Sequence, residues 1–124
     1  MSEIRGVGID LCGIARMEKQ LDKEHFLRRC LTEAEITYVR SKGRNAAASL
    51  AGIFAAKEAV CKALGTGIAF PLTEIEVQHT EAGQPVAVLS GRAAELAGGG
   101  DVKLSITHEG DTAAAFAVWT ANRT

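Results

Sequence analysis

Two carboxylates and one amine are the residues of this sequence best suited to do chemistry together. Asp10 lies in the apolar run of residues 4–11, and Glu58 and Lys62 lie one helical turn apart within residues 46–64. Magnesium accepts one or two carboxylates and completes its shell with water and phosphate oxygens. If the three side chains converge, they form a site for magnesium and phosphate. Taken singly, Asp10 suits a helix cap, and Glu58 with Lys62 suits a surface ion pair worth about 0.3–0.5 kcal/mol.

Two glycine-rich segments are candidates for phosphate contacts. Gly65, Thr66 and Gly67 follow the helix predicted for residues 46–64, at the end where the helix dipole is negative and repels phosphate. They form either a helix C-cap or an irregular loop whose amides contact phosphate. Residues 6–11 lack the third glycine of a dinucleotide-binding fingerprint. We therefore expect neither a P-loop nor a Rossmann domain.

The remaining reactive side chains are a histidine and three cysteines. His108 ends an apolar strand before a turn, where a histidine is either hydrogen-bonded within the fold or in contact with a ligand. Cys12, Cys30 and Cys61 are far apart and form no C-x-x-C pair, so neither a disulfide framework nor a zinc site is indicated. We expect them to be small buried apolar residues in a protein of the reducing cytoplasm.

Local patterns predict the elements that must position these groups. The apolar run of residues 4–11 predicts a buried strand that presents Asp10 at its end. Broken helical patterns follow over residues 14–21 and 25–30. Thr32 and Glu35 then have the spacing of a capping box, so a third helix should begin there and run to about Arg40.

Residues 46–64 form the strongest predicted helix. The segment is rich in alanine, lacks proline, has Asn45 as a suitable N-cap and ends at Gly65, which favours the left-handed C′ position. At about 100° per residue, one apolar stripe of this helix faces the core. The stripe consists of Leu50, Ile53, Val60 and Leu64.

The last half of the chain predicts mainly strands. Residues 75–78 and 85–89 alternate with period two around a turn, a short helix spans residues 91–97, and two further strands span residues 102–108 and 112–119. The predicted fold class is α+β, with a mainly antiparallel sheet packed against the long central helix and several shorter helices. At 124 residues, the chain 1–124 should be one domain.

Charge is distributed unevenly along the sequence. Residues 1–62 carry 11 basic and 8 acidic side chains, a net charge of +3, whereas residues 63–124 carry 3 and 7, a net charge of −4. The net charge of the whole chain, −1, argues against nucleic-acid binding. We also expect no membrane span and no signal peptide. The basic cluster on the early helices is solvated surface or binds an anionic partner. It comprises Arg16, Lys19, Lys23, Arg28 and Arg29.

Three blocks of sequence, taken together, resemble the bacterial holo-acyl-carrier-protein synthases, the small trimeric type of the phosphopantetheinyl transferase family. The blocks are Gly8-Ile9-Asp10, residues 54–67 (FAAKEAVCKALGTG) and Ser105 to Glu109. They occur in the family's order across essentially the whole chain, and the middle block is highly specific. Residues 26–35, which include Leu31-Thr32-Glu33, and residues 83–85 also resemble that family.

The resemblance implies transfer of the phosphopantetheine arm of coenzyme A to a serine of an apo acyl carrier protein, with release of adenosine 3′,5′-bisphosphate. It also implies a role in fatty acid biosynthesis and a homotrimer with active sites at subunit interfaces. Asp10 and Glu58 correspond to magnesium ligands, and Lys62 corresponds to the lysine at the diphosphate. The coenzyme surroundings correspond to Gly65, Thr66, Gly67, Pro85 and His108.

Two further expectations concern catalysis and the carrier. Glu58 is hypothesised to accept the serine proton, directly or through water, and Arg16 matches a family arginine that meets the acidic carrier. Ile53 stands where the family usually has an arginine, so the coenzyme's ribose phosphate would need other cations, such as Lys42 or Arg44. The alternative functions are a non-catalytic carrier-binding module of the same fold and a phosphate-binding ATPase fragment.

Overall fold

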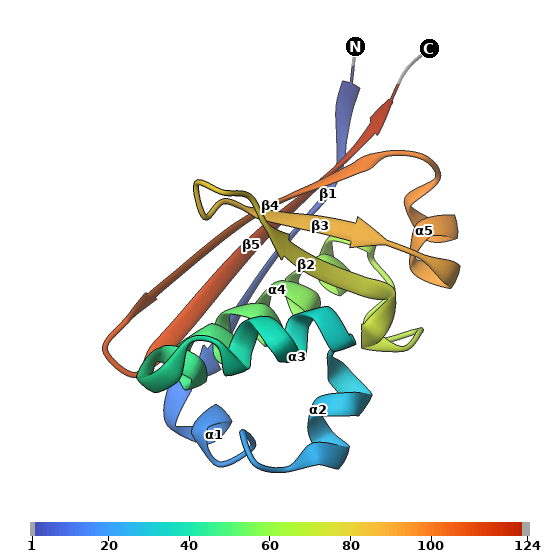
Figure 1. The fold of residues 1–124 in the computed structure, drawn as a ribbon. Helices are drawn as coiled ribbons and strands as arrows, with labels where there is room; N and C mark the ends of the chain where they lie inside the picture. Colours follow the sequence, from blue (N-terminus) through green and yellow to red (C-terminus); the bar gives the residue numbers. More distant parts are fainter. Residues whose placement is uncertain (1, 123–124) are drawn as a thin grey trace.

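Two antiparallel sheets and a long helix organise the fold, which a computed structural model describes for residues 2–122 (Figure 1). The strands are β1 (Ser2–Gly13), β2 (Ile75–His79), β3 (Pro85–Leu89), β4 (Asp101–Glu109) and β5 (Thr112–Asn122). The helices are α1 (Ile14–Glu18), α2 (Glu24–Cys30), α3 (Glu33–Arg40), α4 (Ala46–Leu64) and α5 (Gly91–Ala97), with 3₁₀ turns η1 (Gly43–Asn45) and η2 (Leu72–Glu74). No helix in the described part of the chain is long and apolar enough to cross a membrane.

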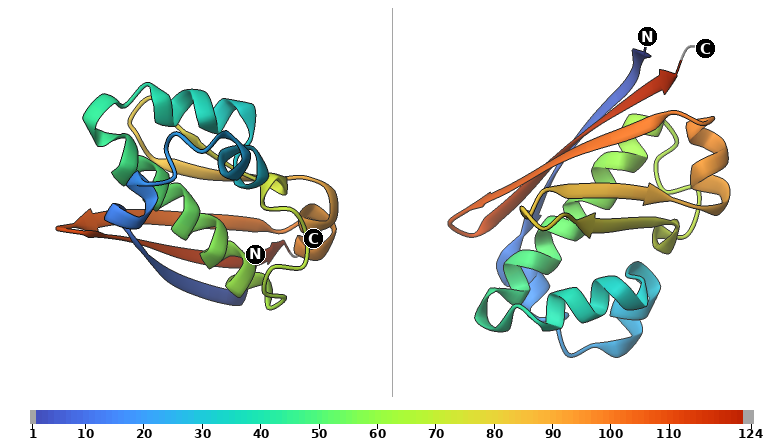
Figure 2. Two further views of the ribbon diagram at one scale, coloured as in Figure 1. Left: turned by 90° about the horizontal axis from the view of Figure 1, so that it is seen from below. Right: turned by 45° about the horizontal axis from the view of Figure 1, so that its top comes forward.

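The sheets lie on two sides of α4. One sheet has the strand order β1-β5-β4 and places Asp10 opposite Ala115, and the other is the predicted hairpin of β2 and β3. Helix α4 lies across the three-stranded sheet, with α2 and α3 on its far side (Figure 2, left). The prediction of an α+β fold with antiparallel strands around a long central helix is confirmed.

The helix ends follow the sequence closely, with one exception. Thr32 caps α3 in a full capping box with Glu35, and Gly65 ends α4 with a left-handed φ of 79°. Asn45 occupies the N-cap position of α4, but its side chain makes no capping hydrogen bond. The reason is that η1 leads directly into α4, so Asn45 has a φ of −94° and a ψ of 8° instead of the extended backbone of a capping residue.

The interpretation of β1 as a buried strand ending at Asp10 is wrong on both points. The strand continues to Gly13, and Val7, Ile9 and Leu11 are 54%, 61% and 64% exposed. Because successive side chains of a strand point to opposite faces, only the set containing Gly8, Asp10 and Cys12 faces α4. The opposite set forms an uncovered surface. We call it the outer apolar face, and it consists of Ile4, Val7, Ile9, Leu11 and Phe116.

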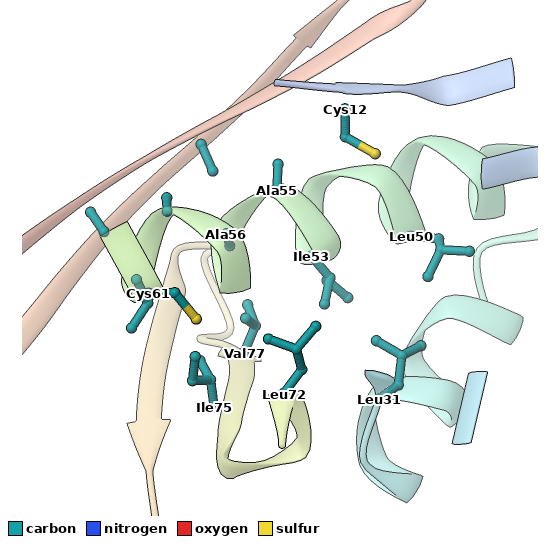
Figure 3. Packing of buried hydrophobic residues seen from close by; sticks show 14 of the residues in the cluster. Cys12, Leu31, Leu50, Ile53, Ala55, Ala56, Cys61, Leu72, Ile75 and Val77 are labelled. Atoms are coloured by element: carbon teal, nitrogen blue, oxygen red, sulfur yellow. The ribbon is translucent and has the colours of Figure 1, made fainter. Parts of the chain in front are cut away.

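The hydrophobic core is built around α4. The predicted stripe of Leu50, Ile53, Val60 and Leu64 is buried, with each residue no more than 7% exposed. Leu50 and Ile53 point toward Leu31 and Leu72, whereas Ala55 points toward the strands (Figure 3). Alanines on the sheet side keep the helix close to β1 and β5, and the larger side chains fill the opposite side.

Replacing Gly8 by alanine is expected to destabilise the protein by about 1–3 kcal/mol, because an added Cβ overpacks the contact between β1 and α4. That Cβ would lie 2.0 Å from the backbone oxygen of Ala59. Gly13→Ala is the matched control, since its Cβ would meet nothing closer than 3.9 Å. Urea unfolding of both variants measures the difference. Equal stability of the two variants would contradict the packing argument.

Candidate active site

Asp10, Glu58 and Lys62 converge at the edge of the molecule where α4 crosses β1. The Lys62 Nζ donates to Asp10 Oδ1 at 3.1 Å and to the Ile9 carbonyl oxygen at 3.0 Å. Glu58 lies close enough for the charges of Asp10 and Lys62 to act on its carboxyl group. The structure therefore joins residues 52 positions apart in the sequence.

Local geometry explains this convergence. Glu58 and Lys62 share one side of α4 because they are four residues apart, and the inner face of β1 presents Asp10 toward that side. The ion pair that forms is Lys62 with Asp10, and among the described residues Glu58 and Lys62 form no salt bridge. The surface-pair alternative for Glu58 and Lys62 is thus not realised.

The electrostatics of Glu58 are unusual for a carboxyl group that is only partly buried. Desolvation raises the pKa of Glu58 above its usual value, and the negative charge of Asp10 raises it further. Lys62 and Arg16 act in the opposite direction. The two carboxylates repel each other and present hard oxygen atoms to the same space, which a divalent cation would relieve. Within residues 2–122 no group of three or more His, Cys, Asp or Glu side chains has the geometry of a metal site.

The loop of Gly65, Thr66 and Gly67 adjoins this cluster. Gly65 N–H donates to the Cys61 and Lys62 carbonyls at 3.1 Å, so the C-cap predicted for the end of α4 is formed. Gly67 has a φ of 62°, and Thr66 is partly buried between two exposed glycines. The loop starts within one turn of Lys62. Because the Gly65 and Thr66 amides donate to carbonyls of α4, the Gly67 amide is the one that this loop offers to a phosphate held by that lysine.

His108 and Pro85 lie apart from the cluster, in a second depression that we call the α3–β4 cavity. Its volume is about 440 Å³. The cavity is lined by Tyr38, Lys42, Asn45, Ala48, Ser49, Gly52, Ile53, His79, Gly83, Pro85, Ile106 and His108. Asp10 belongs to β1 and His108 to β4, the two outer strands of the three-stranded sheet, and β5 lies between them. One chain therefore does not bring His108 to Glu58.

Arg16 lies on the cluster's side of the fold. It is exposed on α1, its Nη2 is 3.6 Å from the Cys12 Sγ, and its charge lowers the pKa of Glu58. Of the residues predicted from the sequence, the structure thus groups Arg16 with Asp10, Glu58 and Lys62. A further cavity of about 480 Å³ lies between β3 and β4. Of the site residues predicted from the sequence, Pro85 alone lines it.

Lys57 is the buried residue that sequence reasoning missed. It is fully buried, with its Nζ 2.7 Å from Glu35 Oε1 and donating to the Leu72 and Ile75 carbonyls at 3.0 and 2.5 Å. Burial lowers the pKa of Lys57, and the carboxylate of Glu35 opposes that shift. A signal existed, because Lys57 lies four residues after Ile53 and three before Val60 on the core stripe.

The prediction of buried apolar cysteines holds for two of the three. Cys12 and Cys61 are buried, Cys30 is partly buried, and all three are free thiols. Burial and the neighbouring Glu58 raise the pKa of Cys61 to about 11. A thiol of that kind stays protonated at neutral pH and is a poor nucleophile.

Comparison with known proteins gives one consistent result. A family model described as the 4′-phosphopantetheinyl transferase superfamily matches residues 6–117. The chain is 44% identical over 119 residues to a holo-[acyl-carrier-protein] synthase of Treponema denticola, covering 93% of this chain and 97% of that protein. A crystal structure of a holo-(acyl-carrier-protein) synthase from Bacillus anthracis in complex with coenzyme A (3′,5′-ADP) has a TM-score of 0.82 and 38% identity, covering 96% of this chain and 98% of the other. The crystal structure of the Helicobacter pylori holo-[acyl-carrier-protein] synthase in complex with coenzyme A has a TM-score of 0.80 and 33% identity. The match covers 90% of this chain and 97% of the other.

Proposed function

The chain belongs to the 4′-phosphopantetheinyl transferase superfamily, and from that premise we propose that it transfers the phosphopantetheine arm of coenzyme A to a serine of an apo acyl carrier protein. The products are holo carrier protein and adenosine 3′,5′-bisphosphate. The observation that carries the proposal is the convergence of Asp10, Glu58 and Lys62 at one edge of α4. This reaction needs those groups, because its substrate presents a diphosphate and its nucleophile must lose a proton.

Asp10 and Glu58 are the residues that would hold magnesium. The donor set fits the ion, because two carboxylates supply part of the shell and leave the rest to water and phosphate oxygens. Bound there, magnesium would supply charge neutralisation at the diphosphate. Lys62 is exposed enough to leave Asp10 for a phosphate oxygen, since its side chain is 56% exposed.

Glu58 would accept the proton of the serine hydroxyl. The serine oxygen then forms a bond to the phosphorus that carries the pantetheine arm, while the bond from that phosphorus to the bridging oxygen breaks and the bisphosphate leaves. Without magnesium, burial and the charge of Asp10 raise the pKa of Glu58, and a bound cation would lower it again, so we assign the proton to Glu58 on its position beside Asp10 and Lys62. The loop of Gly65, Thr66 and Gly67, which follows Lys62 at the end of α4, would lie beside the phosphates.

A non-catalytic carrier-binding module is the second candidate, since it would keep Arg16 and the fold without turnover. Incubation with magnesium, coenzyme A and an apo carrier, followed by mass spectrometry of the carrier, separates the two. A gain of one phosphopantetheine group supports the enzyme. Carrier binding without that gain supports the module and overturns the proposed activity, and nucleotide hydrolysis would instead indicate an ATPase fragment.

We place the reaction in the cytoplasm, in fatty acid biosynthesis, and treat residues 1–124 as a single catalytic domain. One continuous hydrophobic cluster joins every helix and both sheets, which supports the single domain. The three free thiols suit a reducing compartment.

The outer apolar face supports a homotrimer. Contiguous apolar side chains that are 42–68% exposed are typical of surfaces that another chain covers. In one chain, the cluster of Asp10, Glu58 and Lys62 lies at β1 and the second half of α4, whereas the α3–β4 cavity with His108 lies at β4 and the first half of α4. Assembly would let the cluster of one copy face the cavity of the next, so that each active site is built from two chains.

Ile9→Asp is expected to abolish the trimer, because it places an unpaired charge in the middle of the outer apolar face. Ile68→Asp is the matched control, since Ile68 is 62% exposed but lies in the loop after α4. Sedimentation equilibrium measures the mass of each variant. A trimer that survives Ile9→Asp, or a wild-type monomer, would contradict the assembly.

Arg16→Glu is expected to raise the KM for the carrier by about tenfold, while the KM for coenzyme A changes less than twofold. The reason is that the exposed Arg16 charge on α1 would attract only the acidic carrier. Arg92→Glu on α5 is the control, since it makes the same change of charge away from the cluster. Steady-state assays that vary each substrate supply both constants. Equal effects of Arg16→Glu on the two KM values would remove Arg16 from the carrier-binding surface.

A further inference from the structure

We infer that Lys62 competes with the divalent cation for Asp10 in the free protein, and that a diphosphate ends this competition by drawing the lysine away. The consequence is cooperative binding, in which coenzyme A and the cation each raise the affinity of the other. Lys62 has this role only if the diphosphate is that of coenzyme A, so the inference rests on the proposed function.

The ammonium group of Lys62 already lies between two oxygen atoms that would attract any cation. Its Nζ is 3.1 Å from Asp10 Oδ1 and 3.0 Å from the carbonyl oxygen of Ile9. It is also close enough for its charge to act on Glu58. Within residues 2–122 the only salt bridge of Asp10 is the one to Lys62. The lysine therefore supplies the counter-charge that a divalent cation would otherwise give to Asp10.

The close packing of β1 on α4 brings Lys62 to this position. A Cβ at Gly8 would lie 2.9 Å from the Cβ of Lys62 and 2.8 Å from the backbone nitrogen of Ala63. Glycine thus allows the strand to approach the helix closely enough for the lysine to reach the carbonyl of Ile9. The backbone contact therefore sets the pairing of Lys62 with Asp10, so the pair is a property of the fold.

The ion pair is nevertheless easy to break. The side chain of Lys62 is 56% exposed and that of Asp10 is 21% exposed, and ion pairs open to solvent are weak. An ammonium group has three N–H donors, and two of those of Lys62 are used by Ile9 and Asp10. A phosphate oxygen can therefore accept from the third donor first. Rotation of the flexible lysine side chain then completes the transfer while α4 and β1 stay in place.

Charge balance favours binding of both ligands over binding of either one alone. With both carboxylates ionised, Asp10, Glu58 and Lys62 together carry one negative charge. A divalent cation alone would meet the Lys62 ammonium at Asp10, and a diphosphate alone would meet two carboxylates. With both ligands bound, the ammonium pairs with phosphate and the carboxylates pair with the cation. Each ligand removes the repulsion that the other meets, and by linkage the two affinities change by the same factor.

The test measures the affinity for manganese, which prefers the same oxygen ligands as magnesium. Electron paramagnetic resonance counts the free ion during titration of the protein, with and without saturating coenzyme A. A titration of coenzyme A without protein corrects for manganese bound in solution. We expect coenzyme A to lower the wild-type Kd for manganese by about tenfold or more. A Kd that coenzyme A leaves unchanged would overturn the inference.

Lys62→Met distinguishes competition from a general effect of charge. Without coenzyme A, the variant should bind manganese about tenfold more tightly than wild type, because Asp10 is then free of its ammonium partner. With coenzyme A bound, the two proteins should differ by less than about threefold, because the wild-type lysine has then left Asp10. Tighter binding by the same factor in both states would reflect only the lost positive charge and would contradict the inference. Unchanged affinity in the free protein would contradict it as well.

Arg16→Met is the matched control. The charge of Arg16 also acts on Glu58, but within residues 2–122 Arg16 forms no salt bridge with Asp10. Its loss should therefore change the manganese affinity of the free protein by less than about threefold. Lys62→Arg keeps a charge that can pair with Asp10, so its free-state Kd should stay near that of wild type. If Arg16→Met tightened manganese binding as much as Lys62→Met, the general field would explain both and the competition would be refuted.

Failure of the inference is distinguishable from failure of the proposed function. If wild type modifies the carrier while Lys62→Met tightens manganese binding equally in both states, the competition fails and the transferase activity stands. If no carrier is modified but the tightening is confined to the free protein, the competition stands and the proposed activity fails. Thermal unfolding of each variant shows that its Kd belongs to a folded protein.

Discussion

Glu58→Gln is expected to lower kcat by about 10²–10⁴-fold, the range that general acid–base catalysis contributes. Glutamine keeps the size of the side chain and one oxygen atom but cannot accept the serine proton at neutral pH. Glu58 is the carboxylate that α4 places close enough to Asp10 and Lys62 to interact with their charges, so its loss removes the proposed proton acceptor from the cluster. The change is the largest effect on activity that we expect from any conservative substitution.

The assay must separate proton acceptance from metal binding. Rates with varied magnesium, at saturating coenzyme A and carrier, show whether more metal restores turnover. Recovery to near-normal kcat at saturating magnesium would leave Glu58 only as a ligand and contradict its role as base. Glu81→Gln is the control for the loss of one carboxylate, since Glu81 lies in the exposed turn between β2 and β3.

Lys57→Met is expected to destabilise the protein by about 3–5 kcal/mol, because removing one partner of a buried ion pair leaves the other charge uncompensated. Glu35 is as deeply buried as Lys57, and both side chains are 0% exposed. The substitution also leaves the carbonyls of Leu72 and Ile75 without the ammonium donor. The loss would reach beyond α4, because those carbonyls belong to η2 and the start of β2.

Urea unfolding measures this loss, with Lys19→Met, an exposed lysine, as the control. The double variant Lys57→Met with Glu35→Leu tests the cause. It should recover part of the stability but not all, since Glu35 also accepts from the backbone N–H groups of Thr32 at 2.8 Å and Val77 at 2.6 Å. A loss below 1 kcal/mol for Lys57→Met would show that the buried pair contributes no more than a surface pair.

The network around Lys57 also bears on the active site. Lys57 anchors α4 to α3, η2 and β2, and the next residue, Glu58, lies on the side facing β1. Because neighbouring helix residues are about 100° apart, an anchor at Lys57 fixes the rotation of α4 that presents Glu58 to Asp10. The capping box of Thr32 and Glu35 thus serves two purposes, since Glu35 both caps α3 and binds the lysine.

Sequence reasoning succeeded where the determinants lie close together along the chain. The capping box of Thr32, the left-handed end of α4 at Gly65 and the hairpin of β2 and β3 depend on neighbours within a few residues, and all three are present. It failed for β1, where periodicity identified the strand but not its environment. Whether Ile9 and Leu11 are buried depends on which elements cover the sheet, and the described chain leaves them exposed.

By itself, the sequence determined the α+β class, the order of elements and the resemblance that points to Asp10, Glu58 and Lys62. The tertiary structure alone decided how distant residues pair: Lys62 with Asp10, Lys57 with Glu35, and His79 with Tyr38. It also placed His108 in a cavity at β4 and the first half of α4, apart from the cluster of Asp10 and Glu58. The physical reason is range, because propensity, capping and periodicity act over one or two turns of chain, whereas burial and charge pairing depend on which segments the fold packs together.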